Sequence, residues 1–422
     1  MSHALPWSRG PVTSEVRVPG SKSETNRAFV IAALSDGTST VRGALESRDS
    51  DLMVAALQAM NVTVDGDPAD AVRITPPRHF RGVPDGIDCG LAGTVMRFVP
   101  PIAMLADGPT TFFGDPHASN RPMAGLLDAM RQLGADVDSD RLPFTVVPAT
   151  EMGHVVSVDS SATSQYISGL LLVGARLPHG LRIQQVGESV PSRPHIAMTV
   201  HMLREHGVHV DEVDDNTWVV HPSPISARDM TVEPDLTNAS VFLAAAAVTG
   251  GSVTVHDWPE ENQQAGGLFL GIARRFGARV ERDGNTVTLH GPETMQGIDV
   301  DLHASSELTP VVASLAALAS GTTRIRGVGH IRGHETDRLA ALVTEFGKLG
   351  ITASETDDGL VVEGARPEDL VATEFETYAD HRMVHAAAIL ALRVPGLSVT
   401  DFACVAKTMP HFDADWRAAV EA

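Results

Sequence analysis

The sequence predicts an α/β protein of two domains, built from six similar repeats of helices and strands with three repeats in each domain. The chain has 422 residues, more than a single compact core usually holds. A segment rich in alanine and leucine, followed by glycine and an alternating strand pattern, occurs six times, with its glycines 70 to 75 residues apart: Gly37, Gly108, Gly180, Gly251, Gly321 and Gly396. Repeats of this length must stack on one another to bury a core.

A second pattern lies between the alanine-rich segments and consists of an amphipathic helix, a strand, a polar turn and another strand. Five of these helices end at a residue that tolerates a left-handed backbone, namely Asn61, Gly134, Gly207, Gly277 and Gly350. The turns contain Asp-Gly or Asp-Asp-Asn, which favour hairpins. Each repeat is therefore expected to hold two helices and a few strands.

The two ends of the chain are expected to share one domain. The sixth helix, DADWRAAVEA, reaches Ala422 with no hairpin behind it, whereas residues 11–20 form a strand without a repeat of its own that could supply the missing part. Prolines interrupt the pattern near mid-chain, so we expect one domain at residues 20–233 and the other at residues 1–19 together with 234–422. Two connections between domains predict a hinge, and a cleft is the expected ligand site.

Composition limits the classes of ligand and location. The formal net charge of −21 argues against broad binding of nucleic acids or anionic membranes, and it favours a small anionic metabolite held in a locally basic pocket. Cys89 and Cys404 are too few for a disulfide scaffold or a cysteine-rich zinc module. The first residues do not resemble an export signal, and no apolar run approaches the length of a membrane span. We expect a cytoplasmic protein that binds no membrane.

Polar and charged residues gather where the alanine-rich helices begin. Helix N-termini attract anions, and although one such cluster is most simply a cap, five clusters on one period favour ligand binding. Seven cations near turns predict a doubly anionic ligand or two anionic ligands: Lys22, Arg27, Arg97, Arg121, Arg338, Arg382 and Lys407. The carboxylates that accompany them are suited to proton transfer or to ion pairing: Glu307, Glu335 and Asp380.

Several other chemistries find little support. Neither the phosphate loop GxxxxGK[ST] nor a GxGxxG motif after a strand occurs. Four histidines are close enough in sequence to suggest a metal site, but their arginine neighbours disfavour one, and we expect no metal there: His330, His334, His381 and His385. Cys89 has no neighbouring base, so it is expected to be a buried structural thiol.

Seven short motifs together resemble the enolpyruvyl transferase family: PGSKSETNR, LAGTVMR, the Arg121-Pro122 step, TSQ, HETDR, DHR and AKTMP. They follow the family's order over essentially the whole chain and are most similar to the members that act on shikimate 3-phosphate. The resemblance implies two domains of three βαβαββ units each around a hinged cleft. It also implies transfer of the carboxyvinyl group of phosphoenolpyruvate to the 5-hydroxyl group of shikimate 3-phosphate, with release of phosphate and without a metal or organic cofactor.

The resemblance assigns roles to individual residues. Contacts with shikimate 3-phosphate are implied for Lys22, Ser23, Arg27, Thr163, Ser164, Gln165, Ser192, His195, Glu307, His330 and His334. Contacts with phosphoenolpyruvate are implied for Lys22, Gly93, Arg121, Gln165, Arg338, Arg382 and Lys407. Glu307 with Lys22 is the expected proton acceptor at the hydroxyl group. Glu335, assisted by His381 or Lys407, is the expected donor to the methylene carbon. The domain 20–233 is expected to bind mainly shikimate 3-phosphate.

Some positions depart from the family's common residues, and their effect stays open: Leu91, Phe98, His195, Glu307, His330 and His334. Gly93 leaves room beside the phosphoenolpyruvate site, so the resemblance implies inhibition by glyphosate. A monomer is expected.

Two other functions remain as alternatives. UDP-N-acetylglucosamine enolpyruvyl transferases share the fold, but their usual cysteine is absent from GDPHASNRP at residues 114–122. A non-catalytic metabolite-binding protein of the same fold would have no need to retain so many charged residues.

Overall fold

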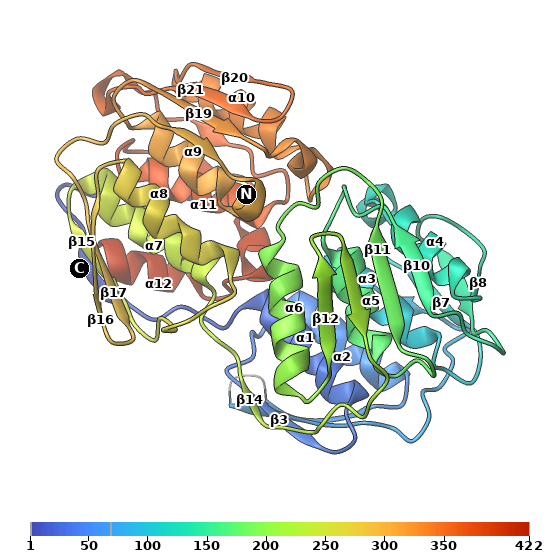
Figure 1. Cartoon of the computed structure of the whole chain (residues 1–422). Helices are drawn as coiled ribbons and strands as arrows, with labels where there is room; N and C mark the ends of the chain where they lie inside the picture. Colours follow the sequence, from blue (N-terminus) through green and yellow to red (C-terminus); the bar gives the residue numbers. More distant parts are fainter. Residues whose placement is uncertain (1, 68–69, 422) are drawn as a thin grey trace. The chain divides into compact units, whose positions relative to one another are not determined.

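The computed structural model describes residues 2–67 and 70–421, which form two compact units (Figure 1). The inserted unit is Gly20–Val232, and the split unit comprises the chain as far as Pro19 together with the chain from Glu233 onward. Each unit has a hydrophobic core of its own. No helix in the described part of the chain is long and apolar enough to cross a membrane.

The inserted unit contains three four-stranded sheets among its described residues, with strand orders β14-β3-β5-β4, β6-β7-β9-β8 and β10-β11-β13-β12. Its strands are β3 (Ser39–Arg42), β4 (Thr63–Asp67), β5 (Ala71–Thr75), β6 (Ile87–Asp88), β7 (Thr110–Phe113), β8 (Asp136–Val137), β9 (Phe144–Val147), β10 (Val155–Val158), β11 (Leu181–Gln185), β12 (Val210–Asp214), β13 (Thr217–Val220) and β14 (Met230–Thr231). Its helices are α1 (Lys22–Leu34), α2 (Arg48–Ala59), α3 (Gly93–Ala103), η1 (Pro116–Asn120), α4 (Ala124–Gln132), α5 (Gln165–Gly174) and α6 (Pro194–Glu205).

The split unit repeats this plan with strand orders β16-β17-β15-β2, β18-β19-β21-β20 and β1-β23-β22. Its strands are β1 (His3–Ala4), β2 (Thr13–Val16), β15 (Ser252–Val255), β16 (Arg279–Asp283), β17 (Thr286–His290), β18 (Asp299–Asp301), β19 (Thr322–Arg326), β20 (Ala353–Glu355), β21 (Leu360–Glu363), β22 (Glu374–Phe375) and β23 (Ser398–Val399). Its helices are α7 (Leu236–Thr249), η2 (Ala265–Leu268), α8 (Phe269–Arg275), η3 (His303–Leu308), α9 (Thr309–Ala317), η4 (Gly329–Gly333), α10 (Arg338–Leu349), η5 (Pro367–Asp369), α11 (His381–Ala391), η6 (Phe402–Lys407) and α12 (Phe412–Val420).

Each four-stranded sheet has the same pairing. One edge strand runs parallel to its neighbour, and the remaining two strands run antiparallel, as in β10, β11, β13 and β12. A parallel pair needs a crossover, and an apolar helix such as α5 provides it. The order β10-α5-β11-α6-β12-β13 is therefore the βαβαββ unit that the resemblance implies.

Three largely buried helices form the centre of each unit. In the inserted unit α1, α3 and α5 contact one another, and in the split unit α7, α9 and α11 do so. Every residue of α7 is buried, which fits a helix that is apolar on all sides. In the inserted unit the N-terminal parts of α1 and α3 meet, since Asn26 Nδ2 of α1 donates to Thr94 Oγ1 of α3 at 2.8 Å. This packing brings polar helix starts together.

The predicted helix ends are confirmed. Asn61, Gly134, Gly207, Gly277 and Gly350 all have positive φ, between 76° and 107°. At Gly350 the backbone N–H returns to the carbonyl groups of the last turn of α10. A left-handed residue of this kind ends the helix and redirects the chain into the following strand.

Residues 11–20 were expected to supply the missing strand of the sixth repeat, and this prediction was wrong. The strand in this segment, β2, runs parallel to β15 in the first sheet of the split unit. The sixth repeat is instead completed by β1, where His3 pairs with Val399. The sixth helix, α12, ends at Val420, and Ala422 lies outside the described residues, as do residues 68–69 in the first hairpin pattern. A two-residue strand has no periodicity, so the sequence pattern could not reveal β1.

Candidate active site

A buried ion pair lies at the start of two helices in the split unit. Arg338, the first residue of α10, donates from Nε to Asp380 Oδ2 at 2.7 Å and from Nη2 to Asp380 Oδ1 at 3.2 Å. Asp380 caps α11 by accepting from the backbone N–H of Arg382 at 2.9 Å. Burial alone would lower the pKa of Arg338, but the charges of Asp380 and Glu335 raise it above its ordinary value. The guanidinium is therefore a permanent cation held in one orientation.

Glu335 is held between two cations. Its Oε2 accepts from Arg338 Nη2 at 2.9 Å, and its Oε1 accepts from Lys407 Nζ at 2.7 Å. The carboxylate side chain is only 8% exposed, and Lys407 reaches it from the end of η6. A short hydrogen bond between an ammonium group and a carboxylate is a route for a proton, so this pair has the geometry of an acid–base couple.

One guanidinium nitrogen of Arg382 lacks a hydrogen-bond acceptor in the described part of the chain. Its Nη2 donates to Glu307 Oε2 at 2.9 Å, and Glu307 lies in η3 just before α9. Its Nη1 is buried and has no hydrogen-bond partner within the described part of the chain. A buried donor without an acceptor is costly, and an anionic ligand oxygen would satisfy it.

Two histidines near Arg338 are neutral for different reasons. Arg338 Nη1 donates to His334 Nδ1 at 2.9 Å, and because guanidinium can only donate, the imidazole must carry its proton on Nε2. His330 lies 2.9 Å from Ser306 Oγ through Nε2. Burial, together with His303 and Arg338, lowers the pKa of His330 to about 4, so it is uncharged at neutral pH.

In the inserted unit, Lys22 and Ser23 begin α1. The helix is capped by Ser21, whose hydroxyl group accepts from the backbone N–H of Glu24. Lys22 Nζ lies 3.5 Å from Asp49 Oδ2, and both side chains are largely buried. A lysine beside an acidic residue at a helix start keeps its charge close to the N-terminal N–H groups, which suits an anion.

Arg27 is already engaged by the protein. It is 1% exposed and donates to Thr199 Oγ1 at 2.7 Å, to the Ser23 carbonyl at 2.8 Å, and to Ser168 Oγ and the His195 carbonyl at 3.2 and 3.1 Å. These bonds tie together α1, α5 and α6. Arg27 therefore positions Ser23 and His195, and its predicted contact with a carboxylate stays a prediction.

Two guanidinium groups surround Gly93 at the start of α3. Arg121 Nη1 donates to the Leu91 carbonyl at 3.0 Å, and Arg97 Nη2 donates to the Pro122 carbonyl at 2.7 Å. A Cβ atom at Gly93 would lie 3.1 Å from Arg121 Nη2 and 3.2 Å from Arg97 Nη1. Glycine is thus what allows both cations to lie against the helix start, where the N–H groups also favour an anion.

The polar cluster before α5 and the turn before α6 complete the inserted unit's candidates. The backbone N–H of Gln165 donates to Thr163 Oγ1 at 3.2 Å, and Ser164 is buried as the N-cap residue of α5. Ser192 has a φ of 52°, which is uncommon for a residue other than glycine. The His195 N–H donates to the Ser192 carbonyl at 3.0 Å. Backbone strain of this kind often occurs at functional sites.

Comparisons with known proteins agree with one another. The family model described as EPSP synthase (3-phosphoshikimate 1-carboxyvinyltransferase) matches residues 7–416. A 3-phosphoshikimate 1-carboxyvinyltransferase of Mycobacterium ulcerans (strain Agy99) is 48% identical over 100% of this chain and 99% of its own length. This chain belongs to the EPSP synthase family. The predicted recognition is therefore confirmed, and so is the predicted activity of carboxyvinyl transfer from phosphoenolpyruvate to shikimate 3-phosphate.

Solved structures confirm the fold. An EPSP synthase from Acinetobacter baumannii superimposes with a TM-score of 0.82 at 22% identity, covering 99% of this chain and 98% of that one. The enolpyruvyl transferase NikO from Streptomyces tendae gives a TM-score of 0.79 at 17% identity, covering 99% and 97%. The predicted enolpyruvyl transferase fold is correct.

The structure brings the predicted site residues of the split unit into one cluster. Arg338 joins Glu335 and His334 directly, Lys407 joins through Glu335, and Arg382 joins Glu307. His381 is buried beside Asp380, with Nδ1 3.5 Å from Oδ1. We call the six residues Glu307, Glu335, Arg338, Asp380, Arg382 and Lys407 the arginine–glutamate cluster.

Sequence reasoning missed several partners. Asp49 was not singled out, although it lies in the first turn of a helix capped by Ser47, the signal used for the other helix starts. Thr199 and Ser168 hold Arg27, and Ser306 holds His330, through contacts between distant segments that no local motif could show. The expectation for Cys89 is confirmed, since it is buried and burial raises the pKa of its thiol to about 12.

Proposed function

We propose that this chain performs its carboxyvinyl transfer with the arginine–glutamate cluster as the catalytic centre. The observation that carries the proposal is that three cations and three carboxylates meet in one cluster, while Arg382 Nη1 is buried without an acceptor among the residues that the structure describes. Phosphoenolpyruvate brings the carboxylate that such a donor needs. The family membership supports the same assignment.

The carboxylate of phosphoenolpyruvate binds to Arg382, with Arg338 beside it. Asp380 occupies Arg338 Nε and part of Nη2, and His334 occupies Nη1, so Arg338 acts chiefly as a fixed charge. Arg382 pairs with Glu307 through Nη2. A substrate carboxylate on Arg382 weakens that pair, which turns Glu307 toward accepting a proton from the 5-hydroxyl group.

The reaction then proceeds by addition and elimination. Glu307, with Lys22, takes the proton of the 5-hydroxyl group as its oxygen forms a bond to C2 of phosphoenolpyruvate. Glu335 receives a proton from Lys407 across their 2.7 Å contact, with His381 as the alternative donor, and passes it to C3 to give a tetrahedral intermediate. In the second step C3 loses a proton, the bond from C2 to the phosphate oxygen breaks, and phosphate leaves. The surrounding cations stabilise the negative charge that moves onto that phosphate.

The substrates are divided between the residues of the two units. We assign shikimate 3-phosphate mainly to the domain 20–233, with Ser23, Arg27, Thr163, Ser164, Gln165, Ser192 and His195, and to Glu307, His330 and His334. We also assign contacts with phosphoenolpyruvate to Lys22, Gly93, Arg121 and Gln165. The two guanidinium groups around Gly93 support a phosphate there. We further propose a monomeric, cytoplasmic enzyme that needs no metal or organic cofactor for this reaction.

The deciding experiment measures phosphate release from phosphoenolpyruvate with a chelator present, using shikimate 3-phosphate or UDP-N-acetylglucosamine as acceptor. Release should occur only with shikimate 3-phosphate. Lys22→Ala and Glu335→Gln should each lower kcat by about 100-fold or more, the usual loss for a general acid or base. Arg17→Ala, at an exposed ion pair with Asp257, is the matched control and should leave the rate unchanged.

Release with the sugar nucleotide alone would contradict the proposed acceptor. Binding of both substrates without turnover would contradict catalysis. Full activity of Glu335→Gln would show that Glu335 does not transfer the proton. The role of the other residues would then be judged from the rate of Lys22→Ala.

A further inference from the structure

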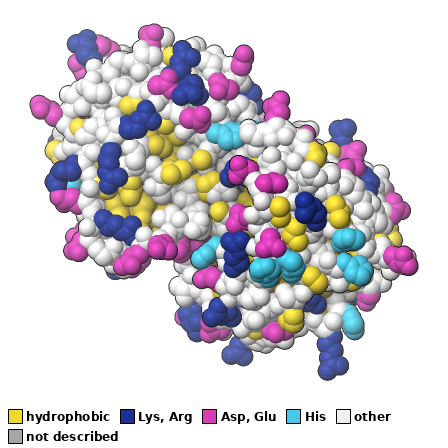
Figure 2. Space-filling view, in the orientation of Figure 1, with side chains coloured by type: hydrophobic (Ala, Val, Ile, Leu, Met, Phe, Trp, Pro, Cys, Tyr) yellow, Lys and Arg dark blue, Asp and Glu magenta, His cyan; other side chains and the backbone are white. Residues whose placement is uncertain are grey.

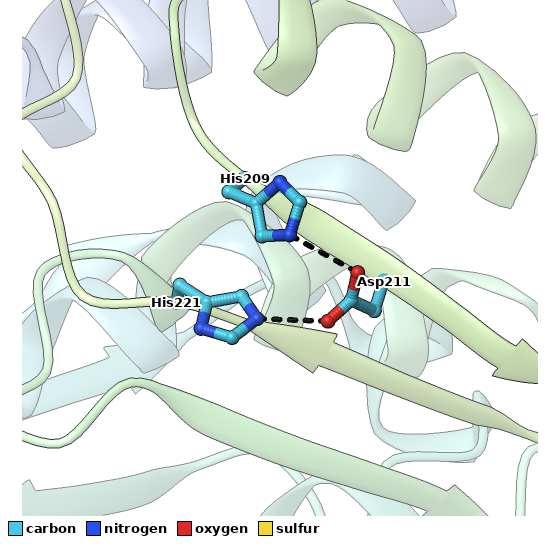
Figure 3. A group of neighbouring side chains, drawn as sticks. All are labelled: His209, Asp211 and His221. Atoms are coloured by element: carbon cyan, nitrogen blue, oxygen red, sulfur yellow. Dashed lines mark hydrogen bonds and ion pairs between the residues drawn. The ribbon is translucent and has the colours of Figure 1, made fainter.

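Three side chains with metal-binding atoms point to one spot on the β12–β13 hairpin of the inserted unit (Figure 3). His209 precedes β12, Asp211 lies within it, and His221 follows β13. The His221 N–H donates to the His209 carbonyl at 3.0 Å, so these residues face each other across the hairpin. Asp211 is two positions along from His209, which puts both side chains on the same face of the strand.

The ligand atoms already lie close together. His209 Nε2 is 3.1 Å from Asp211 Oδ1, and His221 Nε2 is 2.8 Å from Asp211 Oδ2. One ligand atom from each residue lies within 4.8 Å of the other two, and the imidazole rings are 4.7 Å apart between centroids. Bond lengths of 2.0–2.2 Å in a tetrahedral zinc site place neighbouring ligand atoms roughly 3.3 Å apart. Small rotations of exposed side chains are enough to reach that spacing.

We propose that His209, Asp211 and His221 bind one zinc ion, with water completing its coordination. Two imidazole nitrogens and one carboxylate suit a divalent transition metal, whereas calcium and magnesium prefer oxygen ligands alone. No other group of three such ligands with this spacing occurs among residues 2–67 and 70–421. The set is distinct from every residue assigned to the transfer reaction.

The surroundings leave room for the ion and its water. The three side chains are 46 to 70% exposed, and a surface hollow of about 500 Å³ borders His209 and Asp211. The nearest cation on that hollow, Arg204, is paired with Glu212 at 3.1 Å. Figure 2 shows histidine side chains gathered over the region where Figure 1 places β12.

The position of the site indicates a stabilising role rather than a catalytic one. It lies beyond the C-terminal end of α6, whereas Ser192 and His195 lie at the N-terminal end of that helix. Twelve helical residues separate these ends by roughly 18 Å. A bound ion joins the start of β12 to the end of β13, and an ion that binds only the folded state raises its stability by mass action.

The test uses the full chain with its purification tag removed, stripped with a chelator and desalted, and titrated with ZnCl2 in a calorimeter. One zinc ion should bind per chain at micromolar concentration. His221→Ala and Asp211→Asn should each weaken binding by at least about tenfold, because even an outer partner of a metal ligand contributes that much. The matched control is His179→Ala, which removes one member of the exposed pair His154 and His179 in the same unit, whose rings are 5.8 Å apart.

A second readout is the melting temperature with and without zinc. Zinc should raise it in the parent chain and in His179→Ala but not in His221→Ala. All three chains should melt alike in chelator, which shows that His221→Ala is folded. Zinc affinity that is unchanged in both His221→Ala and Asp211→Asn would overturn the proposal, as would equal affinity for MgCl2 or the absence of zinc binding.

Discussion

His330 is an uncharged histidine whose burial has a consequence for acid stability. Its pKa is lowered from 6.5 to about 4 in the folded chain, so the unfolded chain binds the extra proton between these values. The contribution of neutral His330 to the free energy of unfolding has its full value above about pH 6.5, and it decreases as the pH falls toward 4. His330→Asn removes this titration, and its shorter side chain gives up the hydrogen bond to Ser306, a loss that does not depend on pH.

We therefore expect chemical denaturation to show a smaller acid loss in His330→Asn. Between pH 7 and pH 4 the free energy of unfolding of the parent chain should fall by up to about 3 kcal/mol more than that of the variant. Parallel curves for the two chains over that range would show that His330 is not held neutral.

At this scale the sequence predicts which residues carry charge but not how they pair. Lys22 could be selected because it lies at a helix start, and Arg338, Arg382 and Lys407 because they lie near turns. The partners Asp49 and Asp380 stand 27 and 42 residues away from Lys22 and Arg338, so the pairing depends on packing between repeats. The φ of 52° at Ser192 also has no signature in the residues around it.

One carboxylate links the starts of α10 and α11. Asp380 neutralises Arg338 and caps α11, and both charged side chains are at most 2% exposed. Asp380→Asn keeps a cap but leaves the arginine charge in a buried place with less compensation. We expect thermal or chemical denaturation to show a loss of about 3–5 kcal/mol, with a large loss of kcat because Arg338 and Glu335 move.

The matched control is Asp369→Asn. Asp369 binds Arg366 with nearly the same two distances, 2.9 and 3.2 Å, but at an exposed turn. Removing that pair should cost between about 0 and 1 kcal/mol. Equal losses in the two variants would mean that burial does not decide the strength of the Asp380 pair.

Elements with a strong period were predictable, and the shortest ones were not. The six central helices and five helix ends follow from alanine-rich segments and from residues such as Gly134 and Gly350. The position of β1 rests on two residues, and β2 lies beside a strand that follows it by more than two hundred residues. Such pairings are decided by tertiary packing rather than by local preference.

On the scale of the whole molecule, the first residues of the chain support a segment near its end. His3 stacks on Phe402 with ring centroids 3.8 Å apart and contacts Asp413 at 3.0 Å, and Leu5 is buried. Phe402 begins η6, the segment that carries Lys407. The beginning of the chain thus helps to hold a residue that we place in catalysis.

Deleting residues 2–5 should lower the free energy of unfolding of the split unit by about 3 kcal/mol, from the lost burial of Leu5 and the lost hydrogen bonds. It should also lower kcat, because η6 loses its stacking partner. Denaturation and steady-state rates check both effects. Trp7→Ala alters the exposed neighbour in the same segment and should change the free energy by less than about 1 kcal/mol; an equal loss there would contradict the role of β1.

The two crossings between the units lie next to each other. The Asp235 N–H donates to the Pro19 carbonyl at 2.9 Å, and a Cβ atom on Gly20 would lie 3.2 Å from Val232 Cγ1. The inserted unit is therefore a domain inserted at one point of the split unit, between Pro19 and Glu233. Its coding region could be moved to a separate gene, with Pro19 joined to Glu233 by a short linker, to give two polypeptides that each keep a complete core. Such an arrangement would let the two halves be varied, labelled or exchanged with those of relatives independently of one another.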